Sequence, residues 1–174
     1  MKTLFAISLI IPLMGGFFYT KSSGSNKKPE GAVVRYEYGY SNTMAYPITF
    51  YKVYQDESGA VRIAWLKDHG PEVQVIIGPQ DVLERIADIA AQYKLHRIKR
   101  SYYPSVEVLD GTSWHCYIGY EKGSISSDGS NAVAPEKRMN GIYAINAYLQ
   151  SLIDAAPEST VVFRQDFRDF LYAR

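Results

Sequence analysis

Residues 109–135 read LDGTSWHCYIGYEKGSISSDGSNAVAP, and this stretch decides how the middle of the chain folds. Positions 114, 116, 118 and 120 are apolar or aromatic and alternate with the residues between them, which is the period of two of a β-strand. Glu121-Lys122-Gly123 predicts a tight turn, because glycine adopts the left-handed backbone that such turns need. A return strand and a Ser/Gly/Asn loop should then lead into a helix near Pro135. We therefore expect a hairpin at the centre of the fold.

The rest of the chain supplies further strands and two helices. Alternating or β-branched runs predict strands within residues 34–40, 47–55, 60–66 and 72–77. Apolar residues at helical spacing predict helices over about 79–95 and 135–154. The tail from Ser159 fits either a third helix or a strand that enters a short helix. The order ββββ-α-ββ-α plus a C-terminal segment predicts an α+β fold, with a largely antiparallel sheet of five to six strands and two main helices on one face.

The N-terminus has the composition of a targeting segment. Lys2 precedes an apolar run from Leu4 to Tyr19, which is typical of a secretory signal peptide. This run is shorter than the roughly 20 residues of a spanning helix, and an uncleaved N-terminal membrane anchor is the alternative. We assign residues 1–20 to this segment, 21–31 to a polar linker and 32–174 to a single domain. The protein is therefore expected to be exported: periplasmic, secreted or anchored by its N-terminal segment.

Composition and charge narrow the classes of partner. Cys116 is the single cysteine, so no intramolecular disulfide can form. All 18 acidic residues lie from Glu30 onward, whereas four of the 19 basic residues precede it: Lys2, Lys21, Lys27 and Lys28. The chain from Glu30 onward therefore has 15 basic residues and a net charge near −3. This balance argues against nucleic acid as a partner. The three histidines are too far apart for a metal motif, and no glycine-rich phosphate loop follows a strand, so we expect neither metal nor cofactor.

The central stretch carries the residues that best fit a binding site. Its outward strand face and the loop after it are polar, and backbone N–H groups of such a loop can hold an anion. The alternative is a structural loop in which serine and asparagine side chains satisfy the backbone. The ligand-binding candidates are His115, Tyr117, Ser126, Asp128, Ser130 and Asn131. A pocket bordered by Tyr117, Ser130 and Asn131 would favour a small ligand, whereas an exposed patch of Tyr36, Tyr38 or Phe50 would favour a protein partner.

A second candidate is a basic run after the first helix. Lys94, Arg97, Lys99 and Arg100 form the densest positive stretch, and they predict a small anion-binding patch. The alternative is a solvated helix C-terminus, where cations offset the negative end of the helix dipole.

Catalytic arrangements find little support in the sequence. Neighbours in a strand point to opposite faces, so the side chains of His115 and Cys116 diverge. No Gly-x-Ser-x-Gly nucleophile elbow is present. We therefore expect a non-catalytic envelope domain that binds a protein partner or small ligand. The alternatives are a small hydrolase or transferase with a site near residues 113–131, and a structural accessory of an envelope complex.

The central stretch also carries a resemblance. Its pattern is Asp110-Gly-x-x-Trp114, Ile118-x-Tyr120-x-x-Gly123 and Ser127-x-Gly129-Ser-Asn131-Ala-x-x-Pro135. This pattern resembles a signature of uncharacterised secreted and lipoprotein domains of bacteria. The resemblance implies a shared fold and export, and it assigns no activity. Those proteins often carry a lipid-modified cysteine after the signal segment, whereas no cysteine directly follows the apolar run here.

Overall fold

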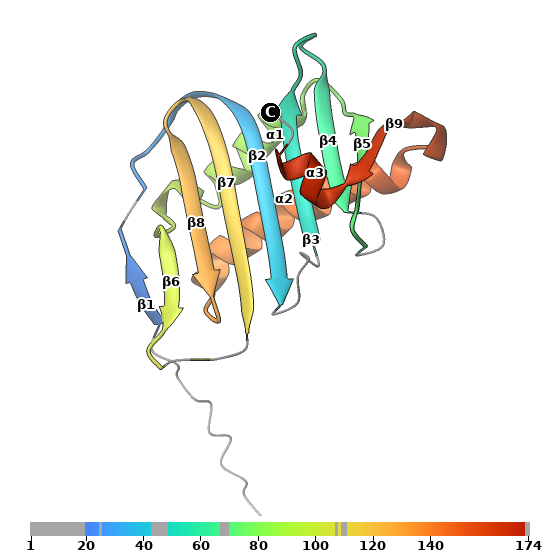
Figure 1. Ribbon diagram of the computed structural model, residues 1–174. Coiled ribbons are helices and arrows are strands. Elements are labelled where there is room, and N and C mark those ends of the chain that lie inside the picture. The colour runs from blue at the N-terminus through green and yellow to red at the C-terminus, as the bar shows by residue number, and fades with distance from the viewer. Residues whose placement is uncertain are drawn as a thin grey trace, which may run out of the picture.

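One sheet of nine strands forms the framework of the protein (Figure 1). The computed structural model describes residues 20–24, 26–42, 49–66, 70–106, 108 and 111–172. The strands lie in the order β1-β6-β8-β7-β2-β3-β4-β5-β9. Their bounds are β1 Thr20–Ser23, β2 Glu30–Asn42, β3 Thr49–Gln55, β4 Val61–Leu66, β5 Glu72–Ile77, β6 Ser101–Pro104, β7 Thr112–Lys122, β8 Ser124–Ser130 and β9 Val161–Asp166.

Two long helices cover one face of this sheet and one short helix lies on the other. Helices α1 (Val82–Gln92) and α2 (Glu136–Ala155) lie behind the sheet in Figure 1, and α3 (Phe167–Tyr172) lies in front of it. The main core lies between the sheet and the two long helices, where alternate strand residues meet the apolar stripe of each helix. Short 3₁₀ helices occur at Leu95–Arg97 and Glu158–Thr160. Among the described residues, no helix combines the length and hydropathy that crossing a membrane requires.

The expected sheet of five to six strands is wrong in size, and the sheet is mixed. Strands β6 and β8 run parallel, whereas every other neighbouring pair is antiparallel. The additional strands are β1, β6 and β9. The first two have four residues each, which is too short to show an alternating pattern. For the tail, the structure takes the second of the two predicted forms, a strand that enters a short helix.

The central hairpin is confirmed. Strands β7 and β8 pair directly, and Gly123 between them has a φ of +89°. Trp114, Cys116 and Ile118 are buried against the helices, while His115 is exposed on the opposite face. Long β2 pairs with β7 on one side and with β3 on the other, so the hairpin lies within the sheet rather than at its edge.

Two glycines of the central stretch make room for side chains of the same stretch. A Cβ on Gly129 would lie 2.1 Å from Nε1 of Trp114, and this nitrogen donates a 2.8 Å hydrogen bond to the carbonyl of Ala132. A Cβ on Gly111 would likewise overlap the amide of Asn131. The spacing of glycine, tryptophan and asparagine in this stretch is therefore a packing requirement.

The segment assigned to the polar linker lies against the sheet where the structure describes it. Strand β1 pairs with β6 over Thr20–Ser23. The side-chain amide of Asn26 donates to the carbonyls of Ile98 and Ser126, and its oxygen accepts from the backbone N–H of Ser126. Asn26 thereby supplies the hydrogen bonds that a neighbouring strand would otherwise give to β8.

Candidate functional site

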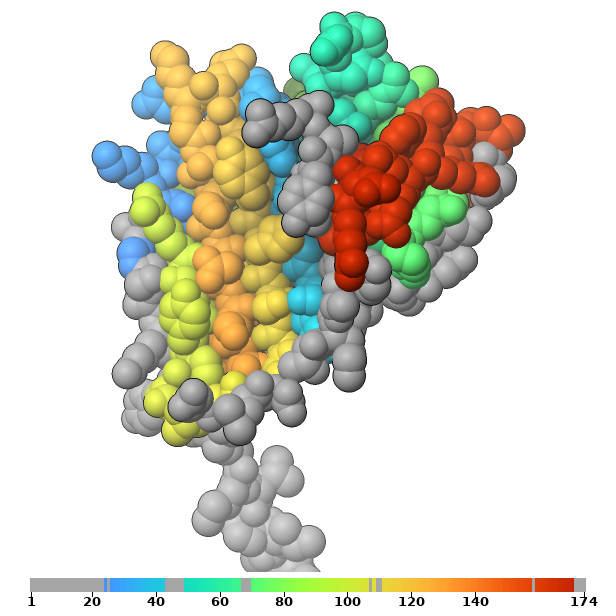
Figure 2. Space-filling view, viewed as in Figure 1, coloured from blue at the N-terminus to red at the C-terminus, as the bar shows by residue number. Residues whose placement is uncertain are grey.

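The sheet face opposite α1 and α2 has an apolar half and a polar half. The apolar half spans β3, β4 and β5 and is covered by α3, while β9 continues the sheet beyond β5. Together β9 and α3 form the red ridge in Figure 2. The buried residues of the apolar half are Phe50, Ala64, Leu66, Val73, Val75, Phe167 and Phe170. The polar half consists of the outward residues of β2, β7 and β8. The outer surfaces of β7 and β8 are open in Figure 2.

Aromatic contacts hold α3 on the apolar half. The ring of Phe50 in β3 meets the rings of Phe167 and Phe170 edge to face, at centroid distances of 5.1 and 6.1 Å. Phe50 is 2% exposed, so it forms the floor on which α3 rests. Such edge-to-face pairs are worth about 0.5–1.5 kcal/mol beyond the burial of their surface. Strand β9 is fixed independently by its pairing with β5.

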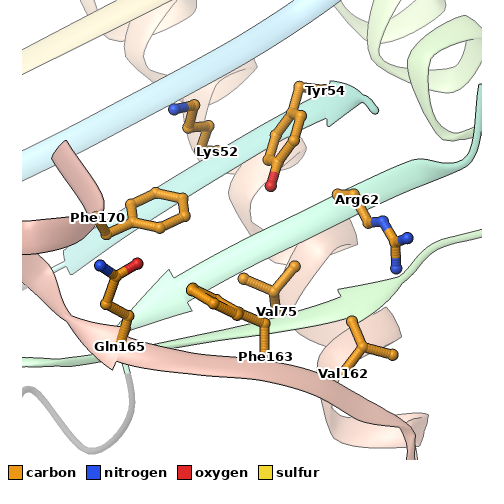
Figure 3. A pocket seen from close by; sticks show the side chains of 8 residues that line it. All are labelled: Lys52, Tyr54, Arg62, Val75, Val162, Phe163, Gln165 and Phe170. Atoms are coloured by element: carbon orange, nitrogen blue, oxygen red, sulfur yellow. The ribbon is translucent and has the colours of Figure 1, made fainter. Parts of the chain in front are cut away.

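A pocket of about 510 Å³ opens beside this aromatic cluster (Figure 3). Residues of β3, β4 and β5 form its floor, and residues of β9 and α3 form the facing wall. The lining residues are Lys52, Tyr54, Arg62, Val75, Val162, Phe163, Gln165 and Phe170. Ligand pockets in proteins commonly measure about 300–1,000 Å³ and combine apolar walls with a few polar groups. This pocket meets both criteria.

Lys52 lies at the edge of the pocket nearest β2. Its ammonium group is 4.8 Å from the ring centre of Phe170 and 5.4 Å from that of Tyr54. Among the described residues, no carboxylate lies within ion-pair distance of it. Burial lowers the pKa of Lys52, the nearby charge of Arg35 lowers it further, and Glu37 opposes both effects. The pocket edge therefore carries a cation with two aromatic neighbours and, within the described part of the chain, no paired carboxylate.

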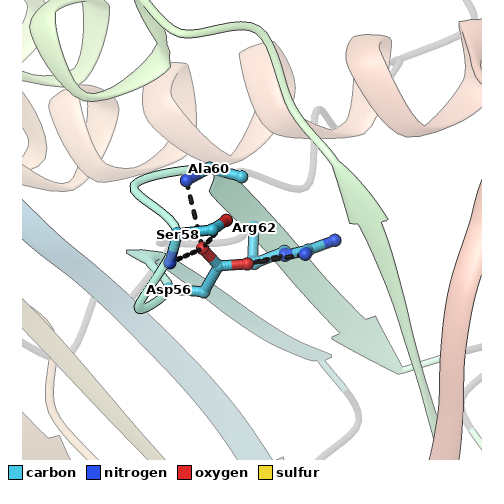
Figure 4. Close-up of polar contacts among 4 residues, drawn as sticks. All are labelled: Asp56, Ser58, Ala60 and Arg62. Atoms are coloured by element: carbon cyan, nitrogen blue, oxygen red, sulfur yellow. Dashed lines mark hydrogen bonds and ion pairs between the residues drawn. The ribbon is translucent and has the colours of Figure 1, made fainter.

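Arg62 at the other end of the pocket is held by a turn (Figure 4). Asp56 accepts hydrogen bonds from the backbone N–H groups of Ser58 and Ala60, at 2.9 and 3.1 Å, and from the Ser58 hydroxyl at 2.6 Å. Its second oxygen is 2.6 Å from the Nε and Nη2 atoms of Arg62. The hydrogen bonds from Ser58 and Arg62 lower the pKa of Asp56 to about 2. The charge of Arg62 is thus already paired.

The polar half brings together most of the residues predicted from the sequence. In the hairpin register, His115 lies opposite Asp128 and Tyr117 lies opposite Ser126. Ser130 lies opposite Ser113 at the end of the same hairpin. These outward positions form a row of polar groups across two strands. The binding role of these residues stays a prediction.

Glu37 of β2 lies in the polar half beside two basic side chains. One of its oxygens is 2.5 Å from Nη2 of Arg35, and the other is 3.7 Å from Nε2 of His115. Burial alone would raise the pKa of Glu37, but the contacts with His115 and Arg35 outweigh it and lower the pKa to about 2. Glu37 is therefore ionised at neutral and mildly acidic pH. The Arg35 guanidinium also lies 5.9 Å from the ring centre of Tyr117.

Asn131 does not point along this row. It has a left-handed backbone with a φ of +49°, and its side-chain oxygen accepts a 2.7 Å hydrogen bond from the backbone N–H of Thr112. Its own N–H donates to the carbonyl of Thr112 at 2.8 Å. These contacts match the structural alternative for the loop, in which the asparagine satisfies the backbone at the start of β7.

Tyr36, Tyr38 and Phe50 do not form an exposed patch. The two tyrosines are buried between β2 and the helices, and the Tyr36 hydroxyl donates a 2.6 Å hydrogen bond to Asn146. Phe50 lies beneath α3. Sequence periodicity places tyrosine on a strand face, but it does not show which of the two faces is covered.

Cys116 is buried on the helix side of β7, away from His115. Burial raises the pKa of the Cys116 thiol to about 12. The group is thus a protonated thiol at neutral pH, and a protonated thiol is a poor nucleophile.

The basic candidates surround the short 3₁₀ helix after α1. Lys94, Arg97, Lys99 and Arg100 are all exposed. Burial lowers the pKa of nearby His96, and the positive charges of Arg97, Lys28, Arg138 and Lys94 lower it further. The structure thus gathers additional cations around this run, including Lys28 from the segment before β2. Anion binding by this patch stays a prediction.

Sequence reasoning missed the pocket itself. Its lining comes from four strands and α3, which are far apart in the sequence. The nearest available sign was the spacing of Phe163, Phe167 and Phe170 in the tail, which shows an apolar segment but not its location. Within the described part of the chain, no group of three or more histidine, cysteine or acidic side chains is arranged to hold a metal ion.

Comparison with protein-family models, with curated proteins and with solved structures finds no match for this chain. The resemblance of the central stretch to secreted and lipoprotein domains therefore stays a prediction. Any inference about function depends on the geometry of the chain's own pocket and surface.

Proposed function

We propose that the protein is an exported, non-catalytic domain of the cell envelope that binds a small ligand between β9–α3 and the sheet. The pocket of about 510 Å³ is the observation that carries this proposal, because it combines aromatic walls with charged groups at its ends. Export is supported by the signal-like composition of the N-terminus and by the resemblance of the central stretch.

A hydrolase or transferase with its site near residues 113–131 has weaker support. Cys116, the most reactive residue type in that stretch, is buried and has a raised pKa. His115 contacts Glu37 on the opposite face of the strand, so the two side chains do not form a nucleophile–base pair.

Ligand binding is tested with the neutral fluorescent probe N-phenyl-1-naphthylamine and two matched variants. Phe163 and Tyr103 are both aromatic and both 45% exposed, but only Phe163 lines the pocket. We expect saturable binding to the unmodified protein and an affinity about tenfold lower for Phe163→Ala, which corresponds to about 1.4 kcal/mol of lost apolar contact. Tyr103→Ala should leave the affinity unchanged. Absence of saturable binding, or equal effects of the two variants, would contradict the proposed site.

Export is tested separately by cell fractionation and by sequencing the N-terminus of the purified protein. We expect the protein outside the cytoplasm, either with a new N-terminus after the apolar run or anchored in the membrane by that run. A protein confined to the cytoplasm and beginning at Met1 would remove export from the proposal.

A further inference from the structure

We propose that the ligand is an organic acid with an apolar body, whose acid group pairs with Lys52 while its body lies against Tyr54, Phe163 and Phe170. This inference rests on the proposed function, because it assigns a ligand class to the same pocket. The charges around the pocket and the composition of its walls both support it.

Two other cations on this face of the sheet already have partners. Arg62 is paired with Asp56 at 2.6 Å, and Arg35 is paired with Glu37 at 2.5 Å. Lys52 contacts the faces of two aromatic rings and no described carboxylate. Glu37 lies opposite Lys52 in the β2–β3 register, but its ion-pair contacts are with Arg35 and His115. An anion bound beside a half-buried ammonium group that lacks a direct ion pair offsets part of the cost of its burial.

The walls of the pocket determine the rest of the ligand. Phe163 and Phe170 from the C-terminal segment face Tyr54 and Val75 from the sheet (Figure 3). These side chains offer area for a flat or aliphatic body and few groups that require hydrogen bonds. A strongly hydrated ligand such as inorganic phosphate would leave this area unused, whereas an apolar acid would use both the walls and the cation.

The position of Lys52 also favours an acid group at the open edge. Lys52 lies on the side of the pocket nearest β2, while Arg62 with its bound Asp56 lies at the opposite end (Figure 3). At that end Asp56 already neutralises the charge of Arg62, whereas the Glu37 carboxylate near Lys52 is held by Arg35 and His115. The acid group should therefore lie toward β2 and the apolar body toward β9.

Two probes with the same aromatic body test this inference. The compound 8-anilinonaphthalene-1-sulfonate carries an anionic group, and N-phenyl-1-naphthylamine lacks it. We expect the sulfonate to bind about tenfold more tightly to the unmodified protein. Lys52→Met keeps the apolar stem over Phe170 and Tyr54 but removes the charge. This variant should lower the affinity for the sulfonate about tenfold and that for the neutral probe less than twofold.

Lys137→Met is the matched control, because Lys137 is exposed on α2, on the other face of the sheet. It should change neither affinity. If the two probes bind with equal affinity, or if Lys52→Met lowers the affinity for both probes equally, the ligand is not an acid, although the pocket still binds it. Sulfonate binding that Phe163→Ala does not weaken would place the probe elsewhere and overturn the assignment of an acid as well. If neither probe binds, both the inference and the proposed function are overturned.

Discussion

Replacement of Phe50 by alanine is expected to lower the free energy of unfolding by about 3–5 kcal/mol, the usual cost of removing a buried phenylalanine ring. Phe50 is 2% exposed and makes edge-to-face contacts with Phe167 and Phe170. Its removal leaves a cavity beneath α3, because the backbones of β3 and β4 are fixed by their pairing. The measurement is urea unfolding followed by circular dichroism.

The same variant should also weaken the binding of N-phenyl-1-naphthylamine, since Phe170 is a wall of the pocket and rests on Phe50. Phe50→Leu retains part of the volume and should have a smaller effect on both quantities. Tyr103→Ala, the exposed aromatic control, should change stability by no more than about 0.5 kcal/mol. A loss below about 1 kcal/mol in Phe50→Ala would show that α3 does not depend on this contact.

Replacement of Trp114 by alanine should have an effect of similar size, about 3–5 kcal/mol, for a different reason. Trp114 is 4% exposed in the main core, lies 6.1 Å from the ring of Tyr102 and donates its indole N–H to the carbonyl of Ala132. It thus joins β7, β6 and the segment that leads into α2. Urea unfolding of the purified protein measures the loss.

Trp114→Phe separates the ring from the hydrogen bond. It keeps most of the apolar contact but leaves the carbonyl of Ala132 without its donor, which costs about 1–3 kcal/mol. The phenylalanine variant should therefore be clearly more stable than the alanine variant. Equal losses in the two would mean that the hydrogen bond, and not packing of the ring, accounts for the contribution of Trp114.

The sequence predicted the local structure of the central stretch well, because the residues that determine it are close together. Alternation along β7, the turn at Gly123 and the helix after Pro135 all depend on neighbouring residues. The role of Asn131 as a backbone partner was one of the two alternatives for its loop. What the sequence did not show was that Gly129 makes room for Trp114, since this depends on the hairpin register.

The edges of the sheet and the pocket depended on contacts between distant parts of the chain. Strand β1 is a short polar segment whose partner β6 lies more than 75 residues further along the chain. Strand β9 is mostly exposed and gains its place from β5. Lys52 in isolation is an ordinary strand residue, and only the docking of α3 places the ring of Phe170 beneath its charge. Local patterns carry none of this information.

The most direct test of a ligand site between β9–α3 and the sheet is a titration of the ¹⁵N-labelled protein with N-phenyl-1-naphthylamine, followed by amide chemical shifts. We expect saturable shifts concentrated in β3, β4, β9 and α3, at the amides nearest Tyr54, Phe163 and Phe170. Shifts confined to the outward residues of β7 and β8, or no saturable shifts at any concentration of probe, would contradict this site.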